Sequence, residues 1–415
     1  MHRRTAVLLV GTAAALVPPV AGGTTVVAPS GRAYDPFSLA ADRAAAGRAV
    51  VAWTLASPRA TVQAAERPRA GARFGRPVTL GRGRVARAAL SPRGGHAVVA
   101  RVDGGRVQLA TRRATGGWRQ AALPAGTPGG QGVRVSGLEV WEDGAAVATV
   151  EVRAPSRYRV AVLERRAGGG RPWRLAAVRD VPDSAGGQAV VEGRGAVTVV
   201  WLAVEARTTV VRAVRRPFGA SRFGAVEEVV RGAPGAPLGE PQVAVGAGDR
   251  VAVLAGVPAE DGEILAARVA TRRGAGRWTV SAPWPATSVA VGGDEVWAAR
   301  TVAGRRGTAV QTRRMGADGR WQAPRTVRAA APRRIAGGPG LVVPRPGHPV
   351  AWWAAEAARG ADRWYAASRR PRGWGAPRLM GATDGAVEFG VGGGGALAVL
   401  VAPGGGGRVV AAELP

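Results

Sequence analysis

Four glutamates are the residues of this chain best placed to do acid–base chemistry. Each lies at or near the first strand expected in one of several repeating units: Glu139, Glu192, Glu240 and Glu388. Hydrolysis of a glycosidic bond needs two placed carboxyl groups, one of them with a raised pKa. Because the four glutamates come singly from different units, they could act together only around a common axis. We assign a catalytic role to none of them, and a glycan-active hydrolase remains the alternative function.

The other reactive side chains predict no cofactor-binding or metal site. The chain has no cysteine, which excludes disulfides, zinc–thiolate sites and thiol nucleophiles. Two of its three histidines, His96 and His348, follow Gly- and Pro-rich turns, and we interpret both as ordinary turn residues. The densest acidic cluster, Glu260, Asp261 and Glu263, is interpreted as a solvated loop, with a calcium site as the alternative.

The charge of the chain predicts an anionic partner. Its net charge is +30, from 58 basic against 28 acidic residues, and every basic residue is arginine. Such a field attracts polyanions, and arginine binds carboxylates and phosphates through two parallel hydrogen bonds. The arginines are spread along the whole chain, so a dispersed, solvated surface is the simpler interpretation. The specific prediction is a monomer that binds a wall polymer, an acidic glycan or an acidic protein, and not nucleic acid.

A recurring pair of arginines followed by a lone aromatic shows how these residues are positioned. The aromatics recur about every fifty residues, which is typical of stacked or radial supersecondary units. They are Phe74, Trp118, Trp173, Phe223, Trp278, Trp321 and Trp374. We call them the marker aromatics. We predict that one arginine of each pair lies over the ring, and that the ring fills the gap between neighbouring units.

Each unit contains four strand signals. The first is weakly alternating, as at 38–44 and 137–144, and the second is strongly apolar, as at 49–55 and 196–204. The third alternates and ends in arginine, as at 210–216. The fourth carries the marker aromatic. Runs of β-branched residues bounded by Gly, Pro and Asp indicate strands, and four strands in about fifty residues indicate a propeller blade. The sequence predicts an all-β fold, a β-propeller of four-stranded antiparallel blades.

The two ends of the chain predict how the ring closes. Signals for the first three strands occur eight times, and the last set, 385–392, 396–402 and 407–414, lacks a fourth strand. A further strand signal at 24–30 precedes the first unit. We therefore expect this N-terminal strand to complete the last blade, which would protect an otherwise exposed edge. That predicts eight blades, with seven as the alternative if the last unit is irregular.

Residues 1–22 have the layout of a secretory signal peptide. Arg3 and Arg4 precede an apolar stretch at 6–17, and small residues follow two prolines. The stretch is shorter than the roughly 20 residues that span a bilayer, so no transmembrane segment is expected. We predict a secreted or cell-surface protein, with residues 23–415 as a single β-propeller domain.

The repeat resembles a loose group of exported bacterial β-propellers, which are sialidase-like in general plan. The resemblance is carried by AVVAW at 49–53 with RFGRPVTL at 73–80, and by PVAWW at 349–353 with GWGAPRLM at 373–380. It implies the fold but no activity, because the Ser-x-Asp-x-Gly-x-Thr-Trp box of sialidase-type repeats is absent. The function predicted is an exported, non-enzymatic module that binds or scaffolds.

Overall fold

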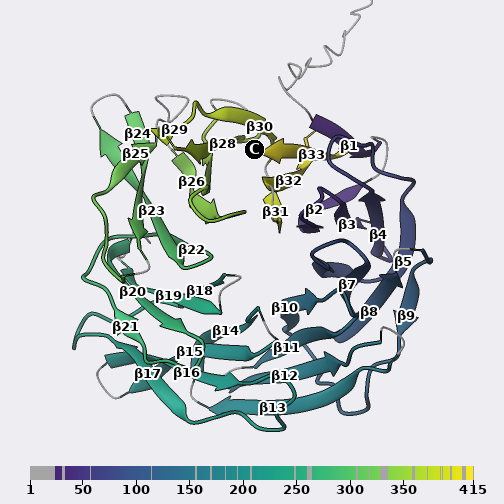
Figure 1. Cartoon of the computed structure of the whole chain (residues 1–415), viewed down its shortest axis with the longest axis horizontal. Helices are drawn as coiled ribbons and strands as arrows, with labels where there is room; N and C mark the ends of the chain where they lie inside the picture. The colour runs from purple at the N-terminus through teal and green to yellow at the C-terminus, as the bar shows by residue number, and fades with distance from the viewer. Residues whose placement is uncertain are drawn as a thin grey trace, which may run out of the picture.

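The chain folds into a closed ring of eight antiparallel sheets, an eight-bladed β-propeller (Figure 1). The computed structural model describes residues 24–414, apart from 30–32, 57, 114, 155–156, 169–170, 183, 194, 206–207, 247–248, 259–263, 305–306, 317, 328–334, 358–359, 372, 384, 386, 393–394 and 404–407. The predicted signal peptide and the acidic cluster at 260–263 lie outside these residues. Eight blades are present, so the seven-blade alternative is wrong. The described residues include no helix long and apolar enough to cross a bilayer.

Blades 1 to 7 are meanders of consecutive strands, with the first strand of each nearest the axis. Blade 1 consists of β2 (Tyr34–Arg43), β3 (Ala49–Leu55), β4 (Thr61–Arg67) and β5 (Val78–Arg82). Blade 2 consists of β6 (Arg84–Leu90), β7 (His96–Asp103), β8 (Arg106–Arg113) and β9 (Arg119–Ala121). Blade 3 consists of β10 (Val133–Val140), β11 (Ala146–Ala154), β12 (Arg157–Arg165) and β13 (Arg174–Pro182). Blade 4 consists of β14 (Ser184–Val191), β15 (Val197–Glu205), β16 (Thr208–Arg216) and β17 (Val226–Arg231).

The remaining meanders keep this order. Blade 5 consists of β18 (Gln242–Val245), β19 (Arg250–Pro258), β20 (Ile264–Arg273) and β21 (Thr279–Val280). Blade 6 consists of β22 (Ser288–Gly292), β23 (Glu295–Gly304), β24 (Gly307–Met315) and β25 (Arg325–Val327). Blade 7 consists of β26 (Ile335–Val342), β27 (Val350–Ala355), β28 (Arg363–Arg370) and β30 (Arg378–Ala382), and β29 (Gly373–Trp374) also pairs with β28.

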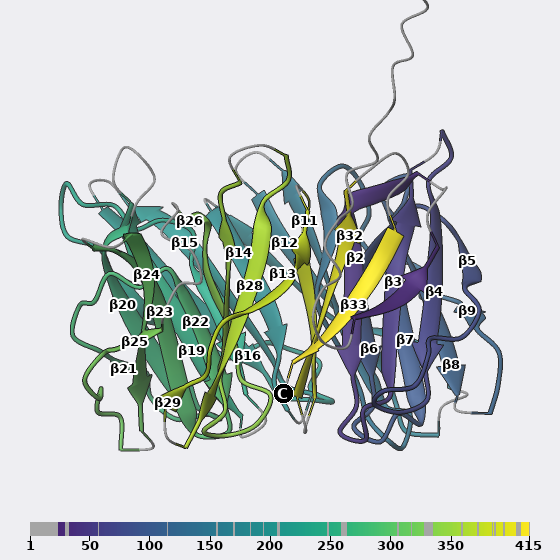
Figure 2. The ribbon, with the colours of Figure 1, turned by 90° about the horizontal axis from the view of Figure 1, so that it is seen from above.

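Blade 8 joins the two ends of the chain, as predicted. It consists of β31 (Val387–Gly392), β32 (Gly395–Ala402), β33 (Arg408–Leu414) and, on the outside, β1 (Thr24–Ala28). Strand β1 runs antiparallel to β33, with Val26 opposite Val410. Figure 2 shows the two strands side by side at the wall of the ring. The ring is therefore held shut by backbone hydrogen bonds between its first and last strands.

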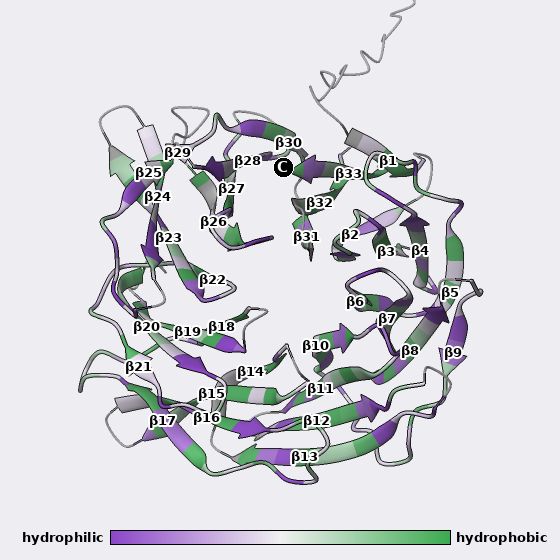
Figure 3. Ribbon diagram, in the orientation of Figure 1, coloured by the Kyte–Doolittle hydropathy of each residue, from purple (hydrophilic) through white to green (hydrophobic). Residues whose placement is uncertain are grey.

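The second and third strands of each blade are apolar on both faces because both faces are covered by neighbouring blades. In β3, Val51 and Trp53 belong to the core between blades 8 and 1. Val50 and Ala52 point the other way, into the core between blades 1 and 2. Successive side chains of a strand alternate between faces, so one apolar run supplies two cores. Figure 3 shows this as hydrophobic middle strands with hydrophilic residues toward their ends.

Each marker aromatic packs into the core between its own blade and the preceding one, as predicted. Trp173, for example, is 4% exposed and lies in the core formed by blades 2 and 3. The stacking of arginine over the marker occurs in blades 1, 3, 5 and 6: Arg67 over Phe74, Arg165 over Trp173, Arg272 over Trp278 and Arg313 over Trp321. The core between blades 7 and 8 has no marker and instead contains Trp352, which stacks on Phe389 and lies at a tilt against Trp364.

The expected strand limits are wrong at the inner and outer edges of the blades. The first strands were expected at 38–44 and 137–144, whereas β2 begins at Tyr34 and β10 at Val133. Both contain a register shift that interrupts the alternation of side chains. The marker aromatics were expected on the fourth strands, yet most precede them, as Trp118 precedes β9. The fourth strands are short, and the marker ring is held by packing instead of strand pairing.

Candidate functional site

Two of the four glutamates considered for catalysis lie near the axis. Glu139 is on β10 and Glu388 on β31, the innermost strands of blades 3 and 8. The surrounding protein limits the hydration of the Glu139 carboxyl group and so raises its pKa to about 7, although part of the side chain is exposed to solvent. Burial also raises the pKa of Glu388, and the positive charge of Arg87 opposes both shifts. Arg87 therefore acts on two carboxyl groups that come from non-adjacent blades.

The other two glutamates do not join this group. Glu192 is fully buried beside blade 5, where it accepts a hydrogen bond from Arg215 at 2.9 Å and lies 3.6 Å from Arg272. Glu240 lies in the connection before blade 5, and its half-exposed side chain pairs with Arg153. Both glutamates neutralise arginines, so the structure gives them a role in holding blades together.

Asp42 is an axial carboxyl group that the sequence analysis missed. It was not among the acidic residues considered for catalysis, although β2 (Tyr34–Arg43) places it on the inner strand of blade 1. One carboxylate oxygen accepts the backbone N–H of Arg43 at 2.7 Å, and the other accepts that of Leu90 in blade 2 at 2.6 Å. Burial and the nearby charge of Glu139 raise the pKa of Asp42 well above its ordinary value.

Asp42 and Glu139 share a small axial hollow. It has a volume of about 270 Å³, and Arg87 and Gln188 also line it. The two residues occupy the same place in their blades, since each pairs with the second residue of the next strand: Asp42 with Val50 and Glu139 with Val147. Alignment of the repeats on the second strands could therefore have identified Asp42. Asp42 and Glu139 are thus equivalent positions of blades 1 and 3.

A larger cleft lies between blades 2 and 3 and is strongly basic. Its volume is about 580 Å³, and it is formed by the ends of the third strands and the segments that follow them. Its charged and titratable lining residues are Arg112, Arg113, Arg119, Arg165, Arg171 and His96. None of the described residues that line it is acidic. We refer to it as the arginine cleft.

The positive charges in the arginine cleft repel one another. Burial and the charge of Arg113 lower the pKa of Arg165. Burial, Arg165 and Arg113 lower the pKa of His96, against a weaker opposing effect of Glu142. His96 was expected to be an ordinary turn residue, and the structure places it at the start of β7 in this cleft. Because like charges are held together here, a bound anion would relieve the repulsion.

Two buried groups of the arginine cleft have hydrogen-bond donors to offer. Arg165 is 4% exposed, its Nε donates to the Gly144 carbonyl at 2.9 Å, and its guanidinium lies 5.4 Å from the centre of the Trp173 ring. The buried Nε1 of Trp173 has no acceptor among the described residues. The same is true of Trp278, Trp321 and Trp374, so the indole does not distinguish this cleft. Arg165 does, because a buried guanidinium that lines the cleft favours a ligand that supplies oxygen atoms.

Comparison with known proteins finds similarity in the structure, with little identity in sequence. No protein-family model matches the chain, and no curated protein matches it. The propeller of Dos1 matches with a TM-score of 0.52 and 7% identity over 94% of this chain and 95% of that one. The BP39L lectin from Burkholderia pseudomallei matches with a TM-score of 0.50 and 14% identity, over 84% and 99%. The polysaccharide lyase Uly1 matches with a TM-score of 0.50 and 10% identity, over 82% and 90%. At these identities the matches establish the β-propeller fold alone.

Proposed function

We propose that this chain is an exported, non-enzymatic binding module, and that its partner is an anion that enters the arginine cleft. The observation that carries the proposal is the gathering of five arginines and His96 in one cleft without a carboxylate among the described lining residues. Export is supported by the signal-peptide layout of residues 1–22. A lectin among the structural neighbours supports a binding role for such a fold.

The cleft has an exposed part and a buried part that suit successive stages of binding. Arg113, Arg119 and Arg171 are exposed at its rim and would attract a polyanion over a distance of about one Debye length. Arg165 is buried and would make the closest contact, as a charge-assisted hydrogen bond shielded from water. The rim would therefore govern the rate of association, and the buried arginine the lifetime of the complex.

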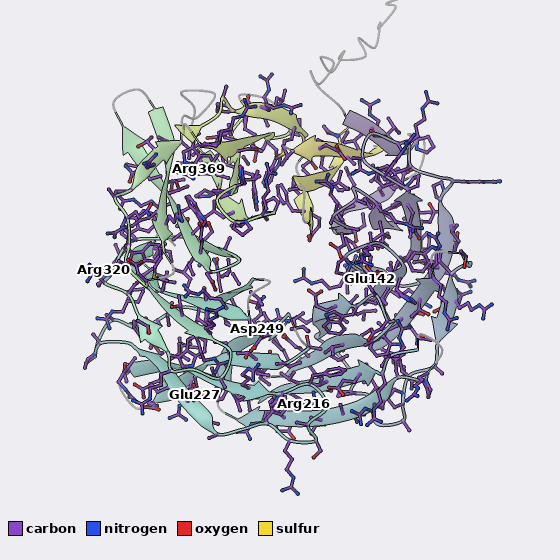
Figure 4. All side chains as sticks on the ribbon, viewed as in Figure 1. Glu142, Arg216, Glu227, Asp249, Arg320 and Arg369 are labelled. Carbon is purple, nitrogen blue, oxygen red and sulfur yellow. The ribbon has the colours of Figure 1, made fainter. Side chains whose placement is uncertain are left out.

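Substitution of the rim arginines tests this proposal. We expect the change of Arg113, Arg119 and Arg171 to Gln to weaken binding of polygalacturonate about tenfold, since three exposed contacts of about 0.2–1 kcal/mol each are lost together. Affinity is measured by calorimetry at low and at moderate NaCl. The matched control changes three exposed arginines of blades 4, 5 and 6, Arg222, Arg277 and Arg320, and removes the same charge. Figure 4 shows Arg320 at the outside of the ring. Equal losses in both variants, or binding insensitive to salt, would contradict the assignment of this cleft.

The axial carboxyl groups favour the alternative, a glycan-active hydrolase, by one observation. Glu139, with a pKa of about 7, could serve as a general acid close to a second carboxyl group. Asp42 is a poor partner, however, because its own pKa is raised and both of its oxygens accept backbone N–H groups. Release of reducing ends from acidic or neutral polysaccharides that Glu139→Gln abolishes would favour the hydrolase. The absence of release would leave the binding module.

A further inference from the structure

Equivalent arginines at five interfaces between blades provide an internal comparison for the arginine cleft. In five blades, the residue opposite the start of the second strand is an arginine near the end of the third strand: Arg67, Arg112, Arg165, Arg216 and Arg272. Blades 6, 7 and 8 have Met315, Ser368 and Leu414 at this position. All five arginines point toward the preceding blade, so their partners there can be compared directly.

In three of these interfaces, the arginine pairs with a glutamate from one fixed position of the preceding blade. Arg216 of blade 4 lies 2.6 Å from Glu164 of blade 3, and both side chains are fully buried. Figure 4 shows Arg216 among the outer strands, away from the axis. The same pairing joins Arg112 to Glu66, and Arg67 to Glu413. Each of these glutamates directly precedes the residue at the arginine position of its own blade: Glu66 before Arg67, Glu164 before Arg165 and Glu413 before Leu414.

Blade 5 obtains its acidic partners from other positions. Its Arg272 lies 3.6 Å from Glu192 and 3.3 Å from Glu227, both in blade 4. The fixed position of blade 4 is itself an arginine, Arg215, which also pairs with Glu192. The fold thus neutralises the buried arginine even where the usual glutamate is missing.

The interface between blades 2 and 3 is the exception. The fixed position of blade 2 is Thr111, opposite Val98, and no ion pair of Arg165 is found among the described residues. Arg165 is nevertheless as deeply placed as its counterparts, at 4% exposure against 1% for Arg67 and 0% for Arg216. Thr111 and Arg165 both line the arginine cleft. A buried charge without a counter-charge is strongly unfavourable, so this interface lacks an element that its counterparts contain.

We propose that a carboxylate of the ligand takes the place of the missing glutamate, between Thr111 and Arg165, and that it belongs to a carboxylated sugar of an acidic polysaccharide. This inference rests on the proposed function and specifies its ligand. The carboxylate is indicated because glutamate carboxylates occupy the equivalent place at three interfaces of the same protein. The sugar is indicated because Thr111 and Thr115 line the cleft beside Arg165 and offer hydrogen bonds suited to hydroxyl groups. The volume of about 580 Å³ also exceeds what a single small anion requires.

The substitution Thr111→Glu tests the inference by supplying the carboxylate from within the chain. We expect the new glutamate to pair with Arg165, to raise the melting temperature by roughly 2 °C or more, and to weaken binding of trigalacturonate at least tenfold. Thr111→Gln is the matched control, because it has nearly the same size and no charge. It should keep most of the affinity and show no rise in melting temperature.

The outcomes separate this inference from the proposed function. Failure of polygalacturonate, dextran sulfate and polyphosphate to bind, or binding that does not depend on the rim arginines, would overturn the proposed function. Two results would overturn only the inference, provided that binding depends on the rim arginines. In one, Thr111→Glu binds trigalacturonate as tightly as the wild type; in the other, Thr111→Glu has a lower melting temperature than the wild type. Equal losses of affinity in the Glu and Gln variants would also overturn it. So would tighter binding of dextran sulfate or polyphosphate than of polygalacturonate, or a protein that binds polyglutamate but not trigalacturonate. Selective loss of trigalacturonate in Thr111→Glu alone would support it.

Discussion

Arginine in this protein is as much an interior residue as a surface residue. Arg67, Arg216 and Arg272 are no more than 2% exposed and lie between blades. The simpler interpretation of the sequence, a dispersed and solvated positive surface, therefore does not describe these side chains. Their long apolar stems pack while their guanidinium groups hydrogen-bond to the preceding blade, a combination that lysine provides poorly.

The ion pair between Arg216 and Glu164 gives a prediction about stability. Glu164→Gln should lower the free energy of unfolding by about 3–5 kcal/mol, because it leaves Arg216 buried without its counter-charge. Chemical denaturation measures the change. Glu228→Gln is the control, since Glu228 pairs with Arg231 in water and should contribute less than about 1 kcal/mol. Similar losses in the two variants would contradict the role of the buried pair.

The raised pKa of Glu139 gives a prediction about pH. The folded state holds its proton up to about pH 7, whereas the unfolded state releases it near 4.5. Between these values the folded state binds more protons, so the wild type should lose stability as pH rises. Glu139→Gln lacks this dependence. The melting temperature of the variant minus that of the wild type should therefore increase from pH 5 to pH 8. A decrease would refute the raised pKa of Glu139.

At the scale of elements, the middle strands were predictable and the edge strands were not. The expected second strand at 49–55 matches β3, and the third at 210–216 lies within β16. The second strands are covered on both sides, so an uninterrupted apolar run identifies them, and the third strands keep a regular alternation. The inner strands are bulged and face the axis, and the outer strands are short, so both lose the alternation on which such predictions depend.

The marker aromatics give a prediction at this scale. Trp278 packs between blades 4 and 5, and Arg272 lies 4.6 Å from the centre of its ring. Trp278→Ala should cost about 2–4 kcal/mol of unfolding free energy, through lost packing and an exposed guanidinium. Trp278→Phe keeps a ring and sacrifices no hydrogen bond, because Nε1 has no acceptor among the described residues. It should cost less than about 1.5 kcal/mol. Equal losses of unfolding free energy in the Ala and Phe variants, measured by chemical denaturation, would show that the aromatic ring does not provide the stability.

At the scale of the whole molecule, the ring was predictable and the arginine cleft was not. A repeat with one missing fourth strand and one extra N-terminal strand identifies a closed ring from the sequence alone. The cleft depends on Thr111 of one blade and Arg165 of the next, which are neighbours only once the blades are placed in order. The signal was present as a glutamate before the arginine in ERPRAG and ERRAGG, replaced by threonine in TRRATGG. This replacement can be interpreted only when it is known which face of blade 2 packs against blade 3.

The closure of the ring gives a prediction for the whole molecule. Val26 and Val410 are directly opposite in the antiparallel pair of β1 and β33, where Cα atoms are close enough for a disulfide. The chain has no other cysteine to interfere. The double variant Val26→Cys and Val410→Cys should unfold about 2–4 kcal/mol less readily when oxidised than when reduced. A single Val26→Cys variant is the control and should not respond to reductant. An oxidised double variant no more stable than the reduced one would contradict the pairing.

Among the described strands β1 pairs with β33 alone, so the strand that is synthesised first must wait for the one that is synthesised after all the others. The segment 24–28 is synthesised before the other described strands, and its partner, 408–414, is synthesised after them. Until then, seven blades can form, while β1 has no strand to pair with and blade 8 is incomplete. Ring closure is therefore a contact between the most distant parts of the described chain, and the entropy of bringing them together makes it a late event in folding.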